Sequence, residues 1–351
     1  MSEKMLAAVF HGPLDLRVER CPIPAISPDE VLIKVISTGI CATDTRIYHG
    51  AHRMIPPGTV RILGHELTGD IVRIGSELKG FKLDQRVFVA PNIGCGQCKQ
   101  CISGNNNRCP DYQAFGITLD GSFAQFMRVP ANAILQGNLI QIEKTIDPAV
   151  AALIEPFACV LRGQDALNIQ PGETVLVIGA GPIGTLHVLL ARLRGAGRIL
   201  VSELIPERVA QASDLDVDRV VNPGDEDLSK VISEETRGLG ADVVIVAAPS
   251  HQAQAIALEL AAIGGRINFF GGLPKDRPNI QLNSNLIHYK ELIVTGTTGC
   301  STDDCRKAAA IAGSGKIDLA KVIGARFPLN QALDAFQAAE NRISLKIILE
   351  P

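Results

Sequence analysis

Four cysteines that could share one metal ion occupy a short stretch of the chain. Cys95, Cys98, Cys101 and Cys109 fall within fifteen residues. Four thiolates at this spacing can close a tetrahedral site around Zn²⁺ with no open coordination position, which is the pattern of a structural metal. An iron–sulfur cluster would use the same ligands. A nucleic-acid-binding zinc element is a third interpretation, although the segment carries few cations. We predict a structural zinc lobe over residues of about 92–112.

A glycine-rich turn is the second chemical signal. It follows the apolar run 173–178 directly and precedes a predicted helix, and an acid, Glu203, ends the next predicted strand. The glycines allow a tight turn and close backbone approach, and the helix N-terminus attracts a pyrophosphate. The alternative is a structural strand–helix turn beside a solvated acid. The residues that we assign to a dinucleotide are Gly179, Gly181, Pro182, Ile183, Gly184, Glu203 and Arg208.

The acid after the second strand bears on which dinucleotide binds. The carboxylate of Glu203 can accept hydrogen bonds from the adenosine ribose hydroxyls, and it would repel a 2′-phosphate. Arg208 lies nearby in the sequence and could partly offset this charge. We predict NAD rather than NADP.

A sparser set of residues could hold a second metal. Cys41 opens the stretch Cys41-Ala42-Thr43-Asp44, His65 and Glu66 follow Gly64, and Glu155 stands before Pro156. One thiolate, one imidazole and one or two carboxylates can bind zinc and leave a position for water or substrate. Each residue also has a structural interpretation, as a buried thiol, a turn histidine or a surface acid. The spacing alone leaves both interpretations open.

The predicted elements that would position these residues are of two kinds. Short β-branched runs at 31–36 and 86–90, separated by irregular glycine-rich stretches, suit a compact, partly open β-barrel. From about Pro171, apolar strands alternate with helices, which predicts an α/β fold with a doubly wound parallel sheet. Its strands are expected at 173–178, 198–202, 218–221, 242–247, 266–270 and 292–295, and later elements at 303–312, 330–339 and 345–349.

Composition limits the class of protein. The 351 residues are 46% hydrophobic and 20% charged, with a net charge of -3, so no general attraction to nucleic acid or anionic lipid is expected. No charge-free apolar run reaches the length of a membrane helix, about 18 residues. The first residues lack the features of a signal peptide, and an odd number of cysteines, nine, argues against a disulfide framework. We expect a soluble cytoplasmic protein.

Taken together and in this order, the motifs resemble the zinc-containing medium-chain dehydrogenase/reductase family of alcohol, sorbitol and threonine dehydrogenases. The resemblance runs nearly the whole chain, and it includes Gly69 after the His65-Glu66 pair. It implies a GroES-like catalytic domain at 1–158, a Rossmann NAD-binding domain at 159–296 and a return to the catalytic domain at 297–351. It also implies a homodimer or homotetramer.

The resemblance assigns roles to the sparse set. Cys41 and His65 would bind a catalytic zinc, Glu66 and Glu155 could alternate as carboxylate ligands, and Thr43 would take the substrate proton. The alcohol oxygen would be bound by a Lewis acid that lowers its pKa, and hydride would pass to the nicotinamide C4. Two zinc ions per chain and NAD are therefore expected.

The substrate is expected to be a secondary alcohol. The Glu155-Pro156 pair resembles that of polyol and threonine dehydrogenases, and the loops at 271–274 and 296–299 look like those of sorbitol and sugar-phosphate polyol dehydrogenases. Sorbitol dehydrogenases, however, tend to place a substrate-binding arginine where this chain has Thr297 and Thr298. We predict oxidation of a polyol, sugar alcohol or sugar-alcohol phosphate. Oxidation of the 3-hydroxyl of threonine is the alternative, and a non-catalytic nucleotide-binding scaffold is an alternative of another class.

The sequence departs from the family at Arg46, two residues after the stretch that Cys41 opens. Relatives often carry a histidine where this chain has Arg46, and arginine does not deprotonate at ordinary pH, so the outer proton relay differs. His49 or His52 could substitute. Arg46, His49, His52 and Arg53 also form a basic stretch that could receive a phosphate or carboxylate of the substrate, the alternative being a solvated loop.

Overall fold

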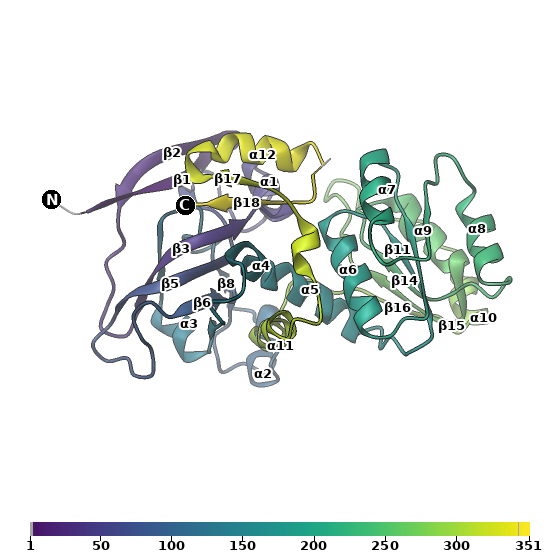
Figure 1. The fold of residues 1–351 in the computed structure, drawn as a ribbon, viewed down its shortest axis with the longest axis horizontal. Helices are drawn as coiled ribbons and strands as arrows, with labels where there is room; N and C mark the ends of the chain where they lie inside the picture. Colours follow the sequence, from purple (N-terminus) through teal and green to yellow (C-terminus); the bar gives the residue numbers. More distant parts are fainter. Residues whose placement is uncertain (1–2, 343) are drawn as a thin grey trace. The chain divides into compact units, whose positions relative to one another are not determined.

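The computed structural model describes residues 3–342 and 344–351, and the chain forms two compact units. Unit 1 comprises Met1–Ala158 and Cys300–Pro351, and unit 2 comprises Cys159–Gly299. The chain therefore begins unit 1, builds unit 2 and returns to complete unit 1, as the colours of Figure 1 allow the reader to follow. Among the described residues, no helix combines the length and the apolar character needed to cross a membrane.

The larger sheet of unit 1 is mainly antiparallel. Its central strand, β3, is buried along most of its length. Strand β18 lies beside β3, with Ile348 opposite Gly39, so segments from both ends of unit 1 share one sheet (Figure 1). The strands in order are β10 (Leu139–Gln141), β6 (Arg86–Val89), β5 (Glu66–Ile74), β3 (Val31–Gly39), β18 (Lys346–Glu350) and β17 (Ile323–Pro328), with β9 (Phe126–Val129) also paired to β3.

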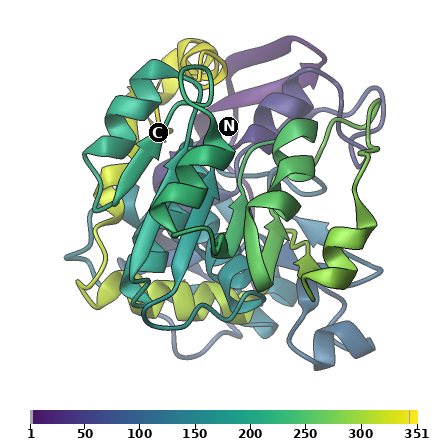
Figure 2. The same ribbon diagram turned by 90° about the vertical axis from the view of Figure 1, so that its right-hand side faces the viewer.

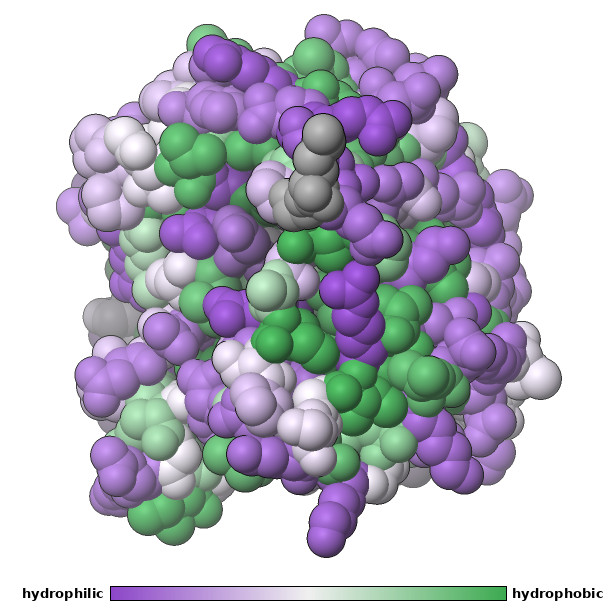
Figure 3. Space-filling view, turned by 90° about the vertical axis from the view of Figure 1, so that its left-hand side faces the viewer, coloured by the Kyte–Doolittle hydropathy of each residue, from purple (hydrophilic) through white to green (hydrophobic). Residues whose placement is uncertain are grey.

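A second sheet and an aromatic cluster complete the core of unit 1. Strands β2 (Asp15–Pro22), β1 (Lys4–Gly12) and β4 (Arg61–Ile62) form this sheet. Its apolar side chains pack with Phe123 and with Phe336 of helix α12 (Ala332–Glu340), whose rings meet edge to face at 5.8 Å. On the face of the molecule shown in Figure 3, hydrophilic side chains surround smaller apolar areas.

The helices of unit 1 are short and follow the turns of the chain. Three 3₁₀ turns, at Asn106–Arg108, Leu319–Val322 and Leu329–Gln331, belong to the same unit. The two-stranded ribbon of β7 (Asn92–Ile93) and β8 (Gln113–Ala114) flanks the segment that carries the four clustered cysteines. The helices are α1 (Ala42–Tyr48), α2 (Lys99–Ile102), α3 (Ala131–Leu135), α4 (Pro148–Ala152) and α11 (Thr302–Gly313), and α5 (Ile154–Asp165) begins in unit 1.

Unit 2 contains the predicted parallel sheet. Every strand pair in it is parallel, and the order β13-β12-β11-β14-β15-β16 places the first strand of the unit in the middle. This arrangement confirms the α/β fold class predicted from the apolar runs. The strands are β11 (Thr174–Ile178), β12 (Arg198–Ser202), β13 (Arg219–Val221), β14 (Ala241–Val246), β15 (Ala261–Phe269) and β16 (Ile293–Thr295).

Helices cover both faces of this sheet (Figure 2). Successive side chains of β11 point to opposite faces, so Leu176 packs with α8 and α9, whereas Val175 and Val177 pack with α6. A strand covered on both sides must be apolar at every position, which explains the continuous apolar runs. The helices of unit 2 are α6 (Pro182–Leu193), α7 (Pro206–Ser213), α8 (Leu228–Glu235), α9 (His251–Leu260) and α10 (Ser284–Tyr289).

The aromatic cluster of unit 1 yields a stability prediction. We expect Phe336→Ala to lower the free energy of unfolding by about 3–5 kcal/mol, because it removes a buried ring and leaves a cavity. Leu333→Ala on the same helix is the control, since Leu333 is 44% exposed, and it should change stability little. Thermal unfolding of both variants measures the difference. An unchanged Tm for Phe336→Ala would contradict the packing described.

Candidate active site

Helix α1 begins with a reciprocal cap that fixes Cys41. The backbone N–H of Cys41 donates to Asp44 Oδ2 at 2.8 Å, and the Cys41 side chain faces the N–H of Asp44. Asp44 is completely buried, and its Oδ1 accepts the N–H of Gly64 at 3.3 Å. The same oxygen lies 3.5 Å from His65 Nδ1. Asp44 thus holds together the two motifs that carry the thiol and the imidazole.

Three predicted metal ligands converge. One ligand atom each from Cys41, His65 and Glu66 lies within 4.8 Å of the others. Glu66 is completely buried, and its Oε2 has no hydrogen-bond partner among the described residues. A Cβ at Gly39 would lie 2.1 Å from that oxygen, so only glycine leaves room for the carboxylate. Thiolate, imidazole and carboxylate are ordinary zinc ligands, and the three residues fit this metal.

The charges around His65 favour a cation. Burial alone would lower the pKa of His65, but the neighbouring Asp44 and Cys41 outweigh it and raise this pKa well above its ordinary value. The imidazole therefore lies in a negative potential. A divalent ion would be stabilised by the same potential.

Lys346 is a member of the site that sequence reasoning missed. It opens β18, its Nζ donates to Glu66 Oε1 at 2.6 Å, and a second bond reaches the carbonyl of Ile40 at 3.3 Å. Burial would lower the pKa of Lys346, but the charges of Glu66 and Cys41 raise it, so the ammonium stays charged. The ammonium of Lys346 is bonded to Oε1 of Glu66, so Oε2 remains available to a metal. A single charged residue in the apolar run 345–349 was the available signal.

Glu155 and Thr43 lie beside the converging ligands rather than among them. Glu155 is on the first turn of α5 and is buried, with its Oε1 3.7 Å from Cys300 Sγ. Its charge also acts on Lys346. Thr43 is on the first turn of α1 and half-buried, two residues after Cys41. The structure thus groups three of the four residues assigned to the catalytic zinc, and Glu155 lies outside that group.

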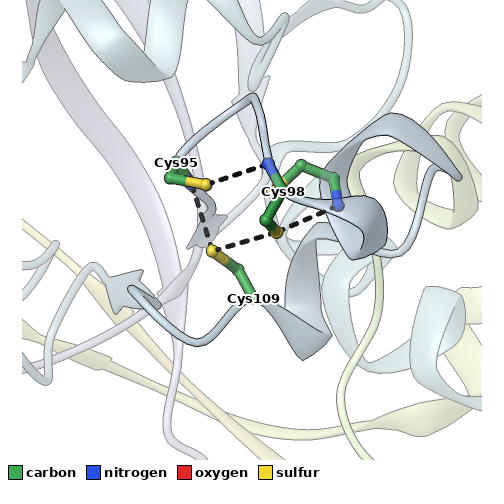
Figure 4. A group of neighbouring side chains, drawn as sticks. Cys95, Cys98 and Cys109 are labelled. Atoms are coloured by element: carbon green, nitrogen blue, oxygen red, sulfur yellow. Dashed lines mark hydrogen bonds between the residues drawn. The ribbon is translucent and has the colours of Figure 1, made fainter.

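The four clustered cysteines form a separate group, of which Figure 4 shows Cys95, Cys98 and Cys109. The sulfur atoms of Cys95, Cys98, Cys101 and Cys109 all lie within 4.8 Å of one another. A Cβ at Gly94 would lie 2.4 Å from Cys101 Sγ, so the chain needs glycine where it passes the group. No carboxylate or imidazole belongs to the group, and four sulfur donors fit a closed tetrahedral site.

Backbone N–H groups support thiolates in this lobe. The N–H of Cys98 donates to Cys95 Sγ at 3.3 Å. Hydrogen bonds from the backbone of Gln97 and Cys98 lower the pKa of Cys95 to about 7. Burial raises the pKa of Cys109 to about 12, so the backbone favours a metal-binding thiolate at Cys95 in particular.

The glycine-rich turn has the geometry of a dinucleotide site. Gly179 has φ +103°, a conformation that side chains disfavour. A Cβ at Gly184 would lie 1.8 Å from the carbonyl oxygen of Gly179, so the helix could not pack so closely on the strand. Helix α6 begins at Pro182 with Gly181 as its N-cap. Its free N–H groups make this end suitable for a phosphate.

Glu203 forms part of this turn. Its Oε2 accepts the N–H of Ala180 at 2.7 Å, and its Oε1 accepts those of Leu204 and Ile205 at 2.8 and 3.0 Å. The carboxylate is buried and fixed against the turn, and Oε2, which accepts one bond, has a further lone pair for a ribose hydroxyl. The guanidinium of Arg208 also lies over the turn, 3.2 Å from where a Cβ of Gly181 would be.

Comparisons with known proteins agree with this geometry. The family described as "Alcohol dehydrogenase GroES-like domain" matches residues 27–139, and the one described as "Zinc-binding dehydrogenase" matches residues 182–314. The sorbitol dehydrogenase of Bacillus subtilis (strain 168) is 32% identical over 339 residues, which cover 96% of this chain and 94% of that protein. The chain belongs to the zinc-containing medium-chain dehydrogenase/reductase family.

Other relatives lie in the same family. The L-threonine 3-dehydrogenase of Bacillus subtilis (strain 168) is 32% identical over 335 residues, covering 94% of this chain and 93% of that protein. A putative zinc-binding dehydrogenase from Sinorhizobium meliloti 1021, solved bound to NADP, has a TM-score of 0.91 at 32% identity, with full coverage of both chains. The family and the GroES-like domain predicted from the motifs are thereby confirmed.

The buried pair of Lys346 and Glu66 can be tested in protein treated with a chelator. Lys346→Met should lower the free energy of unfolding by about 3–5 kcal/mol, because it leaves a buried carboxylate without its partner. Adding Glu66→Gln should restore most of this loss, since the carboxylate charge is then gone. Lys34→Met, at an exposed position of β3, is the control. Additive losses in the double variant, measured by denaturant unfolding, would disprove the coupling.

Proposed function

We propose that this protein is a zinc-dependent oxidoreductase that transfers hydride from the secondary alcohol of a polyol, sugar alcohol or sugar-alcohol phosphate to NAD. The observation that carries the proposal is the convergence of Cys41, His65 and Glu66 on one point, with Lys346 held on a single oxygen of the glutamate. Such a three-ligand set leaves a coordination position for a substrate. The similarity to sorbitol dehydrogenase supports a polyol.

The residues of the chain divide the work of this reaction. Bound zinc would supply a Lewis acid at the substrate oxygen, and bound NAD a hydride acceptor. Cys41 and His65 would hold the metal, and Asp44, facing Nδ1 of His65, would leave the other ring nitrogen for it. Thr43, on the first turn of α1 two residues after Cys41, would take the substrate proton. Glu155 serves as a second carboxylate that can alternate with Glu66.

We assign two zinc ions to each chain. One is the catalytic ion, and the other is held by Cys95, Cys98, Cys101 and Cys109 as a closed structural site. The structural ion would stabilise a lobe built from short elements with little apolar core of its own.

The dinucleotide is assigned to the turn between β11 and α6. The pyrophosphate would lie at Gly181, Pro182 and Ile183, and the glycines at 179 and 184 provide the close approach. Glu203 would accept the ribose hydroxyls, with Arg208 beside them. The fixed, buried carboxylate supports NAD over NADP.

A threonine-like substrate is the second candidate. The L-threonine 3-dehydrogenase of Bacillus subtilis is as similar to this chain as the sorbitol dehydrogenase is, at 32% identity. Both substrates would present a secondary hydroxyl to the same metal. A non-catalytic scaffold is disfavoured, because it has no use for converging metal ligands.

We further propose a cytoplasmic homodimer or homotetramer. All nine cysteines are free thiols, as expected in a reducing compartment. Strand β16 stands at the edge of its sheet with Ile293 more than half exposed, and such edges are available for pairing between copies.

The proposal is tested by NADH absorbance with zinc-loaded protein. NAD is paired with sorbitol, xylitol, inositols, galactitol 1-phosphate and threonine, with a chelator-treated sample beside each. We expect chelator-sensitive turnover on one polyol class. Cys41→Ala should abolish turnover, retain NAD binding and keep one of two zinc ions per chain, because the structural site is separate.

Cys21→Ala is the matched control, since Cys21 belongs to neither group of ligands and should leave activity and metal content unchanged. Turnover on threonine alone would favour the second candidate. Substantial activity of metal-free Cys41→Ala would disprove the zinc mechanism. Bound NAD and zinc with no turnover on any alcohol would favour the scaffold.

The nucleotide preference is a separate prediction. We expect kcat/KM with NAD to exceed that with NADP by at least about tenfold, because Glu203 would repel a 2′-phosphate. Glu203→Gln should reduce this ratio. Glu207→Gln, at an exposed acid on the first turn of α7, should not. A higher kcat/KM with NADP for the wild-type protein would refute the preference.

A further inference from the structure

The segment after α1 folds back against the end of that helix. Arg46 lies on the last turn of α1, and its carbonyl accepts the N–H of Ala51 at 3.0 Å. This bond turns the chain so that His52 and Arg53 follow directly beside the helix end. The basic residues are therefore gathered by a defined backbone turn.

His52 is oriented within this turn. Its Nδ1 accepts the N–H of Met54 at 3.3 Å, which assigns the ring proton of the neutral form to Nε2. The imidazole is half-buried, and burial together with the charges of Arg46 and Arg53 lowers its pKa. The neutral ring of His52 can therefore donate its Nε2–H, in the positive potential of Arg46 and Arg53.

The same turn follows the end of the helix whose N-cap is Cys41. The charges of His65 and Asp44 also act on His52. Arg46 stands five residues after Cys41, which along a helix is about 7 Å. An open-chain sugar derivative can span a comparable distance, with its hydroxyl at the metal and its far end at the arginines.

These two arginines lack acidic partners. In the described part of the chain, neither Arg46 nor Arg53 forms an ion pair, whereas Arg86 and Arg326 pair with aspartates. His49, the fourth member of the basic stretch, is paired with Glu340 and is not available. An anion from outside the chain would therefore complete the charge balance of this turn.

We propose that Arg46, His52 and Arg53 form a subsite for an anionic group, a carboxylate or a phosphate, at the end of the substrate distant from the reacting hydroxyl. The proposal rests on the proposed oxidation of a polyol-like alcohol and narrows its substrate to an anionic one. Guanidinium groups suit either anion, because both offer two oxygens to the same planar donor pair. The imidazole N–H supplies a third donor.

Three matched substrates test the subsite: galactitol, galactonate and galactitol 1-phosphate. We expect the zinc-loaded wild-type protein to have a kcat/KM for one or both anionic substrates at least about tenfold above that for galactitol. Arg46→Gln and Arg53→Gln should each reduce this ratio severalfold, mainly through KM, and the double variant should bring it to about one. The comparison of the two anions distinguishes a carboxylate from a phosphate site.

Arg20→Gln is the control, since Arg20 is an exposed arginine of unit 1, on β2, that also forms no ion pair within the described residues. It should leave the ratio unchanged. A wild-type ratio near one, or a double variant that keeps the wild-type ratio, would overturn the subsite.

A binding measurement separates this proposal from the proposed function. Calorimetric titration with galactonate and with galactitol 1-phosphate should show binding that the double variant weakens and Arg20→Gln does not. If no alcohol is oxidised but this binding pattern holds, the subsite stands and the oxidation fails. If galactitol is oxidised but neither anion binds better than galactitol, the oxidation stands and the subsite is overturned.

Discussion

The carboxylate of Glu66 is completely buried, and a carboxylate without solvent must be compensated by charge from its own protein. Lys346 provides that compensation at 2.6 Å from a strand that follows unit 2 in the sequence. The pairing of β18 with β3 is therefore both a sheet contact and a condition for placing an acid beside Cys41 and His65. Sheet, ion pair and candidate metal site depend on one another.

At each of the three sites, a glycine without a side chain lets a functional atom, or the backbone that supports it, come close to the main chain. Gly39 admits the carboxylate of Glu66, Gly94 admits the sulfur of Cys101, and Gly184 admits the carbonyl of Gly179. In each case an added Cβ would lie within 2.4 Å of the functional atom or its support. The three sites differ in chemistry but share this steric requirement, so alanine at any of them would displace the groups concerned.

Features that depend on residues close in the sequence could be predicted, whereas contacts between distant segments could not. The glycine turn and the four-cysteine lobe depend on spacing within a few residues, so their type and place were predictable. The apolar strands of unit 2 were also predictable, because burial on both faces leaves an unbroken apolar run. Lys346 and Asp44 gain their roles only when distant segments meet, and neither spacing nor composition reveals such contacts. The position of Glu155 outside the three converging ligands depends on the same tertiary packing.

The discontinuity of unit 1 also imposes an order on biosynthesis. A chain emerges from the ribosome from its N-terminus, and domains generally fold as units during synthesis. Unit 2 is one continuous segment, so it can fold while the sheet of unit 1 still lacks β17 and β18. Until those strands emerge, Glu66 has no ammonium partner, and the nascent protein cannot form its finished metal-binding geometry. Unit 2 can thus be complete before the candidate metal site of unit 1.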